Sequence, residues 1–205
     1  MSTSNALDSF LEKWRTRWPE WSMAEPFVLE PERDLTVAWF ALLQEFDDML
    51  NASGDPTPAD AKLAWWGEEL RSWAGQRSRH PLGRVLEPRR APWAQLADVL
   101  PDLVVARGVA ATPAQAFDGL RAYAEAVAAV EAAVFGKGRG GDAADAVLRQ
   151  TLAQRLYDGG VPAVPRSLLD SGAAEAAQAW ARQLLDGWPA RVAGPRPRRI
   201  WSMLA

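Results

Sequence analysis

The sequence predicts an all-α protein, because residues that favour helices dominate and no segment has the pattern of a strand. Ala and Leu far outnumber Val, Ile and Thr, and apolar and polar residues do not alternate. Apolar residues recur instead every three or four positions, which is typical of amphipathic helices. We therefore expect a single all-α domain over residues 1–205, with about seven helices joined by short loops.

The first two helices are predicted by the spacing of their apolar residues. A helix over residues 4–16 carries these residues on one side, and prolines between residues 19 and 31 then break the chain into an irregular connector. A second helix is expected over residues 33–51. The apolar positions are Leu7, Phe10, Leu11 and Trp14 in the first helix and Leu35, Trp39, Leu42, Phe46 and Leu50 in the second.

Two further helices begin with the same signal, TPAD from Thr57 and TPAQ from Thr112. In each, we expect the threonine to be the N-cap and the proline to take the first helical position. The acid or amide three residues after the cap can reach back to it. These starts predict helices over residues 57–73 and 113–135. Their apolar stripes are Leu63, Trp66, Leu70 and Trp73 in the first and Leu120, Tyr123, Val127, Val130 and Val134 in the second.

Three more helices complete the expected bundle, over residues 92–107, 142–157 and 171–188. The segment FGKGRGG lacks the spacing of a phosphate-binding loop and follows no strand, so we interpret residues 136–141 as a connector. Residues 189–205 are a tail rich in Pro and Arg. One interpretation of this tail is that it is frayed or packs a tryptophan onto the body, and the other is that it contacts a partner or a lipid.

The composition excludes several classes of site. The chain has no cysteine, which excludes disulfides, thiolate metal sites and cysteine nucleophiles. Its single histidine, His80, argues against histidine-based zinc sites, and we interpret it as a loop residue. The net charge of −3 gives no reason to expect nucleic-acid binding.

The N-terminal segment has no apolar core of a signal peptide, and no run of residues is long enough to span a bilayer. We therefore expect a cytoplasmic protein of bacterial type without a transmembrane segment. A peripheral position on the inner membrane stays open, because the tail combines arginines with apolar residues.

The segment EFDDMLNASGD, from Glu45 to Asp55, has two interpretations. Asp47 and Asn51 are four residues apart and share one helix face, with Asp48 beside them. A Mg²⁺ ion that bridges a diphosphate takes one or two carboxylates together with phosphate oxygens and waters. The segment is therefore either half of a metal–diphosphate site or the solvated polar end of a helix.

Four segments in chain order resemble the squalene/phytoene synthase family, over roughly residues 28–170. They are PERDLTVAWFALLQEFDDMLN, DPTPADAKLAWWGEELRSWAGQRSRHPLGRVL, LRAYAEAVAAVEAAVFG and LRQTLAQRLYDGGVPAVPRSLL. The resemblance implies an isoprenoid-synthase-like helical bundle, here truncated at its C-terminal end. It also implies that active members join two prenyl diphosphates head to head, with Mg²⁺ held by two aspartate-rich motifs on facing helices.

The two motifs of the family are altered in this chain. The first, Asp-x-x-x-Asp, falls on Asp47 to Asn51, so that one acid is kept and one is an amide, with Asp48 as an additional acid. The second, Leu-Arg-Asp-x-x-x-Asp, falls on LRQTLAQ, where Gln150 and Gln154 replace both aspartates. A glutamine offers a metal one neutral oxygen, and its amide hydrogens repel a cation. The resemblance therefore implies a motif-degenerate member of the family, with the acidic segment as a remnant.

We accordingly expect a protein without prenyl-transfer activity that acts in binding or assembly and needs no metal or cofactor. Its partner would be an isoprenoid or another lipid, or a protein, and a homodimer is compatible with the sequence. The alternative is an active Mg²⁺-dependent prenyl transferase that uses Asp47 and Asp48 as metal ligands. That enzyme would need a further acid, for which Asp142, Asp145 and Asp158 are the candidates.

Overall fold

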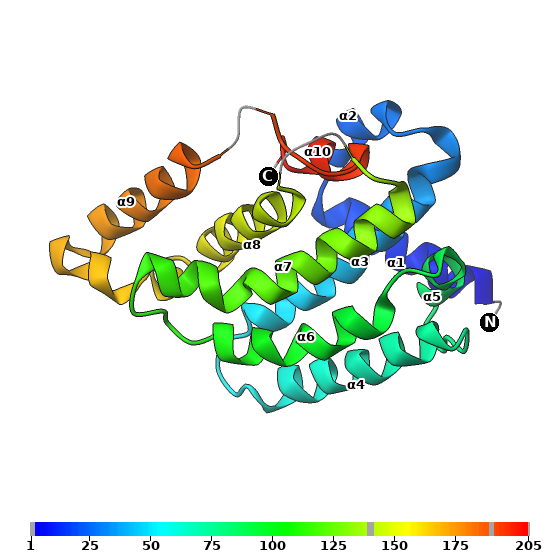
Figure 1. Cartoon of the computed structure of the whole chain (residues 1–205), viewed down its shortest axis with the longest axis horizontal. Coiled ribbons are helices and arrows are strands. Elements are labelled where there is room, and N and C mark those ends of the chain that lie inside the picture. The colour runs from blue at the N-terminus through cyan, green and yellow to red at the C-terminus, as the bar shows by residue number, and fades with distance from the viewer. Residues whose placement is uncertain (1–2, 139–141, 189–190, 205) are drawn as a thin grey trace.

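The structure is a computed structural model that describes residues 3–138, 142–188 and 191–204, and these residues form ten α-helices and no β-strand (Figure 1). The helices are α1 Thr3–Arg17, α2 Trp21–Ala24, α3 Arg33–Leu50, α4 Thr57–Ala74, α5 Gly83–Leu86, α6 Trp93–Ala106, α7 Pro113–Phe135, α8 Ala143–Gly159, α9 Ala173–Asp186 and α10 Arg196–Trp201. None of the described helices is both long and apolar enough to cross a membrane.

The prediction of an all-α protein is confirmed. The seven expected helices are present as α1, α3, α4, α6, α7, α8 and α9, each ending within two residues of the predicted limits. The helices α2, α5 and α10 were not predicted, because elements of four to six residues are too short to show a period. Part of the connector predicted at 136–141 and of the tail predicted at 189–205 lies outside the described residues.

The helix α3 lies at the centre of the bundle. It packs against α1, α4, α5, α6 and α8, and 14 of its 18 residues are buried. The helices α4, α6, α7 and α8 follow one another as antiparallel neighbours and cover one side of α3 (Figure 1). The predicted apolar stripes of α3 and α7 are buried throughout. This arrangement sets the polar residues at the C-terminal half of α3 opposite α8.

Of the two predicted N-caps, one is confirmed and the other is wrong. The Thr112 hydroxyl accepts a hydrogen bond from the Gln115 N–H at 3.2 Å, and the Gln115 side chain accepts from the Ala111 N–H at 2.6 Å. Thr57 does not cap α4. The Asp55 carboxylate accepts from the Thr57 N–H at 3.0 Å instead, because an acid two residues before a helix start can itself satisfy an orphan donor.

An aromatic cluster joins the first and last helices to α3. The rings of Trp14 in α1 and Trp201 in α10 have centroids 5.2 Å apart, and Phe40 of α3 stacks on Trp201 at 5.3 Å. Trp21 of α2 completes the cluster, with its centroid 5.8 Å from that of Phe40. The tail therefore packs a tryptophan onto the body, as one of its two interpretations predicted.

A buried carboxylate, Glu69, connects α4 to the loop that follows it. Glu69 of α4 accepts hydrogen bonds from Trp73 Nε1 at 2.9 Å and from the backbone N–H groups of Arg79 and His80 at 2.6 and 2.8 Å. Burial raises the pKa of Glu69, but these hydrogen bonds outweigh it and leave the pKa below its usual value. His80 is a loop residue, as predicted, with its ring 4.7 Å from that of Trp66. The ionised Glu69 thus anchors the loop after α4.

Candidate functional site

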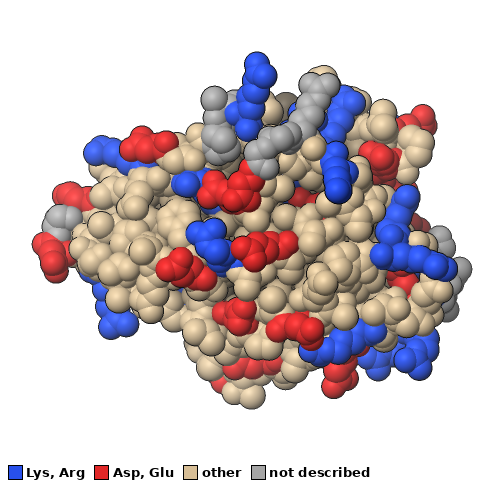
Figure 2. Space-filling model, viewed as in Figure 1, with Lys and Arg blue, Asp and Glu red and all other residues tan. Residues whose placement is uncertain are grey.

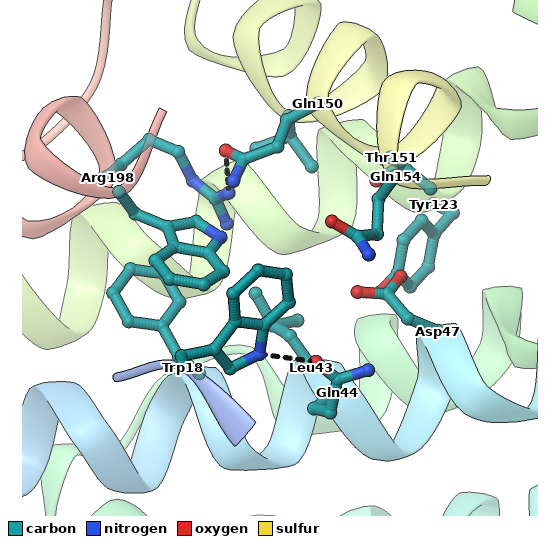
Figure 3. Close-up of a pocket in the computed structure, with 12 residues that line it drawn as sticks. Trp18, Leu43, Gln44, Asp47, Tyr123, Gln150, Thr151, Gln154 and Arg198 are labelled. Atoms are coloured by element: carbon teal, nitrogen blue, oxygen red, sulfur yellow. Dashed lines mark hydrogen bonds between the residues drawn. The ribbon is translucent and has the colours of Figure 1, made fainter. Parts of the chain in front are cut away.

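Asp47, Gln150 and Gln154, three of the predicted site residues, come together from facing helices at one small pocket (Figure 3). Asp47 comes from α3, Gln150 and Gln154 come from α8, Tyr123 comes from α7, and Arg198 comes from α10. The complete lining is Trp18, Phe40, Leu43, Gln44, Asp47, Tyr123, Val147, Gln150, Thr151, Gln154, Arg198 and Trp201. Four helices, α3, α7, α8 and α10, therefore contribute to it, together with the loop residue Trp18.

Side chains nearly fill this pocket. The centres of water molecules can occupy about 20 Å³ of it, which is room for about one water. Figure 3 shows Trp18 and neighbouring rings on the side toward α10, and Phe40 and Trp201 are both buried there. A pocket for a prenyl chain would need on the order of 300 Å³ or more. The space between the two motifs is therefore too small for such a substrate.

Asp47 is the acid that faces the pocket. Burial raises the pKa of its carboxyl to about 7, the Arg198 charge lowers it, and the charges of Asp48 and Asp158 raise it. Figure 3 shows Tyr123 beside Asp47, and the pKa of the Tyr123 phenol is also raised, first by burial and then by the Asp47 charge. Near neutral pH about half of the Asp47 carboxyls therefore hold a proton that a metal ion would first have to displace.

Gln150 holds the C-terminal helix in place. Its Oε1 accepts hydrogen bonds from Arg198 Nη1 at 2.8 Å and from Ser202 Oγ at 2.7 Å. Two donors converge on this oxygen, so the network requires the carbonyl of Gln150, and not its amide nitrogen, to point toward α10. The Gln150 side chain is thus occupied by contacts within the protein.

A buried ion pair attaches α10 to α7. Arg198 and Glu131 are 3% and 1% exposed, and Arg198 Nε donates to the two Glu131 oxygens at 2.9 and 3.1 Å. Arg198 Nη2 also donates to Glu131 Oε1, and Trp39 Nε1 donates to the same oxygen at 2.8 Å. Buried charges are tolerated when their hydrogen-bonding groups are satisfied in this way. With Gln150, this ion pair makes one continuous polar network under α10.

Sequence reasoning missed both members of this ion pair. Glu131 lies four residues after Val127 and three before Val134, within the apolar stripe of α7. An acid on an apolar stripe indicates a buried partner, so this signal was present in the sequence. Arg198 had no comparable signal, because the tail is short and contains several arginines.

A guanidinium lies between the acids of α3 and α8. Arg17 at the end of α1 contacts Asp48 Oδ1 through Nη1 at 2.9 Å, and its Nη2 lies 3.9 Å from Asp158 Oδ2. Gln154 Nε2 donates to the same Asp158 oxygen at 3.0 Å. Within residues 3–138, 142–188 and 191–204, no group of three or more His, Asp or Glu side chains could hold a metal ion. The cation between the two helices thus comes from the protein itself.

The other candidate residues lie away from the pocket. Asn51 is the C-cap of α3 and does not line the pocket, although it was expected on the same face as Asp47. Asp142 caps the start of α8 by accepting from the Asp145 N–H at 3.0 Å, and Asp145 pairs with an arginine of the same helix. Both lie at the opposite end of α8 from Asp158. Of the three additional acids, Asp158 is the one that approaches the acids of α3.

No family model, no curated protein and no solved structure matches the chain. The described residues define the class as an all-α protein.

Proposed function

We propose that the protein is a squalene/phytoene synthase-like protein with an isoprenoid-synthase-like bundle, and that it acts in binding or assembly without prenyl-transfer activity. One observation carries the proposal: the pocket between the two altered motifs has room for about one water molecule. A prenyl diphosphate could enter only if Trp18, Phe40 and Trp201 gave up their contacts with one another.

The chemistry of the pocket supports the same proposal. Ionisation of an allylic diphosphate depends on cations that stabilise the leaving group. The positions that would hold Mg²⁺ carry Gln150 and Gln154, and the remaining acid, Asp47, has a pKa of about 7. The two nearest cations are already bound, Arg198 to Glu131 and Arg17 to Asp48. The pocket is therefore poorly suited to bind a diphosphate–Mg²⁺ complex.

The test is an assay of pyrophosphate release from farnesyl diphosphate and from geranylgeranyl diphosphate, each with Mg²⁺. We expect the wild-type rate to equal that of Asp47→Ala and that of a reaction without protein. Asp98→Ala is a matched control, because Asp98 is an exposed acid on α6 that pairs with Arg71. Release by the wild type and by Asp98→Ala that is lost in Asp47→Ala would show that the proposal is wrong.

One observation favours the alternative of an active Mg²⁺-dependent prenyl transferase. Asp48 and Asp158 both approach Arg17, so a movement of α1 would leave these two acids facing each other beside Asp47. Calorimetric titration with Mg²⁺ tests this arrangement in Arg17→Ala. Binding by Arg17→Ala that is abolished by adding Asp158→Asn would support the alternative, and absence of binding would argue against it.

A further inference from the structure

An open apolar groove lies on the side of α10 that faces away from the buried polar network. Met23 of α2 and Phe27 of the 3-10 helix Glu25–Phe27 form one wall, and Ile200, Met203 and Leu204 form the other. The groove has a volume of about 440 Å³, far larger than the filled pocket on the inner side of α10.

The helix α10 and the turn after it present two different faces. The inward face is fixed by Arg198, Trp201 and Ser202, which contact Glu131, the aromatic cluster and Gln150. The outward residues recur at spacings of three and four and are Arg196, Arg199, Ile200 and Met203. Because the inward contacts lock the rotation of α10, this outward face is held toward solvent.

The apolar side chains of the groove are unusually exposed. Met23 is 67% exposed, Phe27 is 63% exposed and Met203 is 82% exposed. Single exposed apolar residues are common on monomers, but a contiguous apolar surface usually marks a contact with a partner or a membrane. Met23 and Phe27 come from one segment and Met203 from another far along the chain, and all three border the same groove.

The charges around the groove are basic. Arg196 and Arg199 line it, and among the residues that the structure describes no acidic side chain does. Residues 187–205 contain no acid and, besides the buried Arg198, three arginines, although the whole chain carries a net charge of −3. Figure 2 shows basic side chains along the upper edge of the molecule, where Figure 1 places α10, and acidic side chains at the right end of that edge. An apolar surface with a basic rim is complementary to anionic headgroups over hydrocarbon.

We propose that this groove docks the protein on an anionic membrane surface. Met23, Phe27 and Met203 enter the boundary between headgroups and acyl chains, while Arg196 and Arg199 contact lipid phosphates. This inference goes beyond the proposed function and holds whether or not the protein acts on prenyl diphosphates.

Two other occupants fit the groove less well. A second copy related by a two-fold axis would bring the arginines of one groove close to those of the other, and like charges repel. A protein helix would find few polar groups in the groove except the two guanidiniums to fix its orientation. A fluid lipid surface needs no fixed orientation, so it matches an open groove with flexible methionines.

The experiment is flotation of the full chain with lipid vesicles. One set contains phosphatidylcholine alone, and in the other about a third of the lipid is phosphatidylglycerol. We expect binding to the anionic vesicles, little binding to phosphatidylcholine, and loss of binding at about 1 M salt, where screening is nearly complete. Arg196→Glu should lower the partition coefficient at least about fivefold, and Phe27→Asp/Met203→Asp at least about tenfold.

A matched control carries the same charge change on another surface. Val105 on α6 is 81% exposed and Tyr157 on α8 is 82% exposed, so Val105→Asp/Tyr157→Asp should bind within about twofold of the wild type. The proposal is overturned if the wild type does not float with anionic vesicles, or if both double variants bind equally well. The groove would instead belong to a second copy if two results came together. The wild type would be a dimer by light scattering and would not bind vesicles, and Phe27→Asp/Met203→Asp would be a monomer.

Discussion

The ion pair between Arg198 and Glu131 should stabilise the protein more than any exposed pair, and Arg198→Met tests this. Methionine keeps much of the volume of the arginine stem but removes every donor to Glu131 and to Gln150. Glu131 would then keep one partner, the Trp39 Nε1–H at 2.8 Å, in a position that is 1% exposed.

The expected cost follows from this geometry. Removing one partner of a buried, hydrogen-bonded pair leaves an uncompensated charge, which costs about 3–5 kcal/mol. For a chain of 205 residues, each kcal/mol lowers the melting temperature by about 2–4 °C, so Arg198→Met should melt about 6–20 °C below the wild type.

Urea unfolding followed by tryptophan fluorescence measures the free energy of unfolding. Glu131→Gln removes the other charge while keeping an acceptor for Trp39, so the double variant Arg198→Met/Glu131→Gln should be at least about 2 kcal/mol more stable than the sum of the single effects predicts. Arg71→Met is the control, because Arg71 pairs with Asp98 at 2.8 Å while both side chains are more than half exposed. The control should cost less than about 1 kcal/mol.

The reasoning would be refuted if Arg198→Met cost no more than Arg71→Met. It would also be refuted if the effects of Arg198→Met and Glu131→Gln were additive, because additive effects mean that the two charges do not interact.

Three other substitutions test contacts elsewhere in the bundle. Glu69→Gln keeps a carbonyl oxygen for the donors at Oε1, but it removes the charge and turns amide hydrogens toward Arg79 Nε. It should cost about 1–3 kcal/mol in urea, whereas the exposed Glu68→Gln should change little. Folded Asp47 keeps a proton that the unfolded chain releases near pH 4, so the free energy of unfolding should fall by up to a few kcal/mol as the pH rises to about 7. Asp47→Asn should remove this dependence of the free energy of unfolding on pH. The same dependence in Asp47→Asn would show that it does not arise from Asp47. Trp201→Ala should cost about 3–5 kcal/mol and leave an apolar cavity, and indole should then raise the melting temperature of the variant but not of the wild type.

The long helices could be predicted from the sequence because their apolar stripes extend over several turns. The stripe from Leu35 to Leu50 in α3 is an example, since every position in it is buried. The cap at Thr57 failed because α4 begins one residue earlier than expected, with Pro56 as its N-cap. The Asp60 N–H, from which a cap at Thr57 would accept, donates to the Pro56 carbonyl at 2.9 Å, and Asp55 accepts from the Thr57 N–H.

The candidate site was less accessible from the sequence than the fold. The resemblance pointed to the pair of helices that carries Asp47, Gln150 and Gln154. It described Gln150 as a lost acid, whereas the structure gives this side chain two donors from α10. A contact between residues 48 positions apart leaves no periodic trace in one sequence, so this part of the pocket needed a three-dimensional structure.

The aromatic cluster has a consequence for protein synthesis. Trp201 packs against Trp14, Trp21 and Phe40, and Arg198 pairs with Glu131. Because Trp201 and Arg198 both belong to α10, the bundle lacks these contacts until α10 leaves the ribosome. At about 5–20 residues per second, roughly ten to thirty seconds pass between translation of Phe40 and of Trp201. During that interval the nascent chain exposes tryptophans and an unpaired acid. We therefore expect chains arrested before α10 to bind chaperones or be degraded.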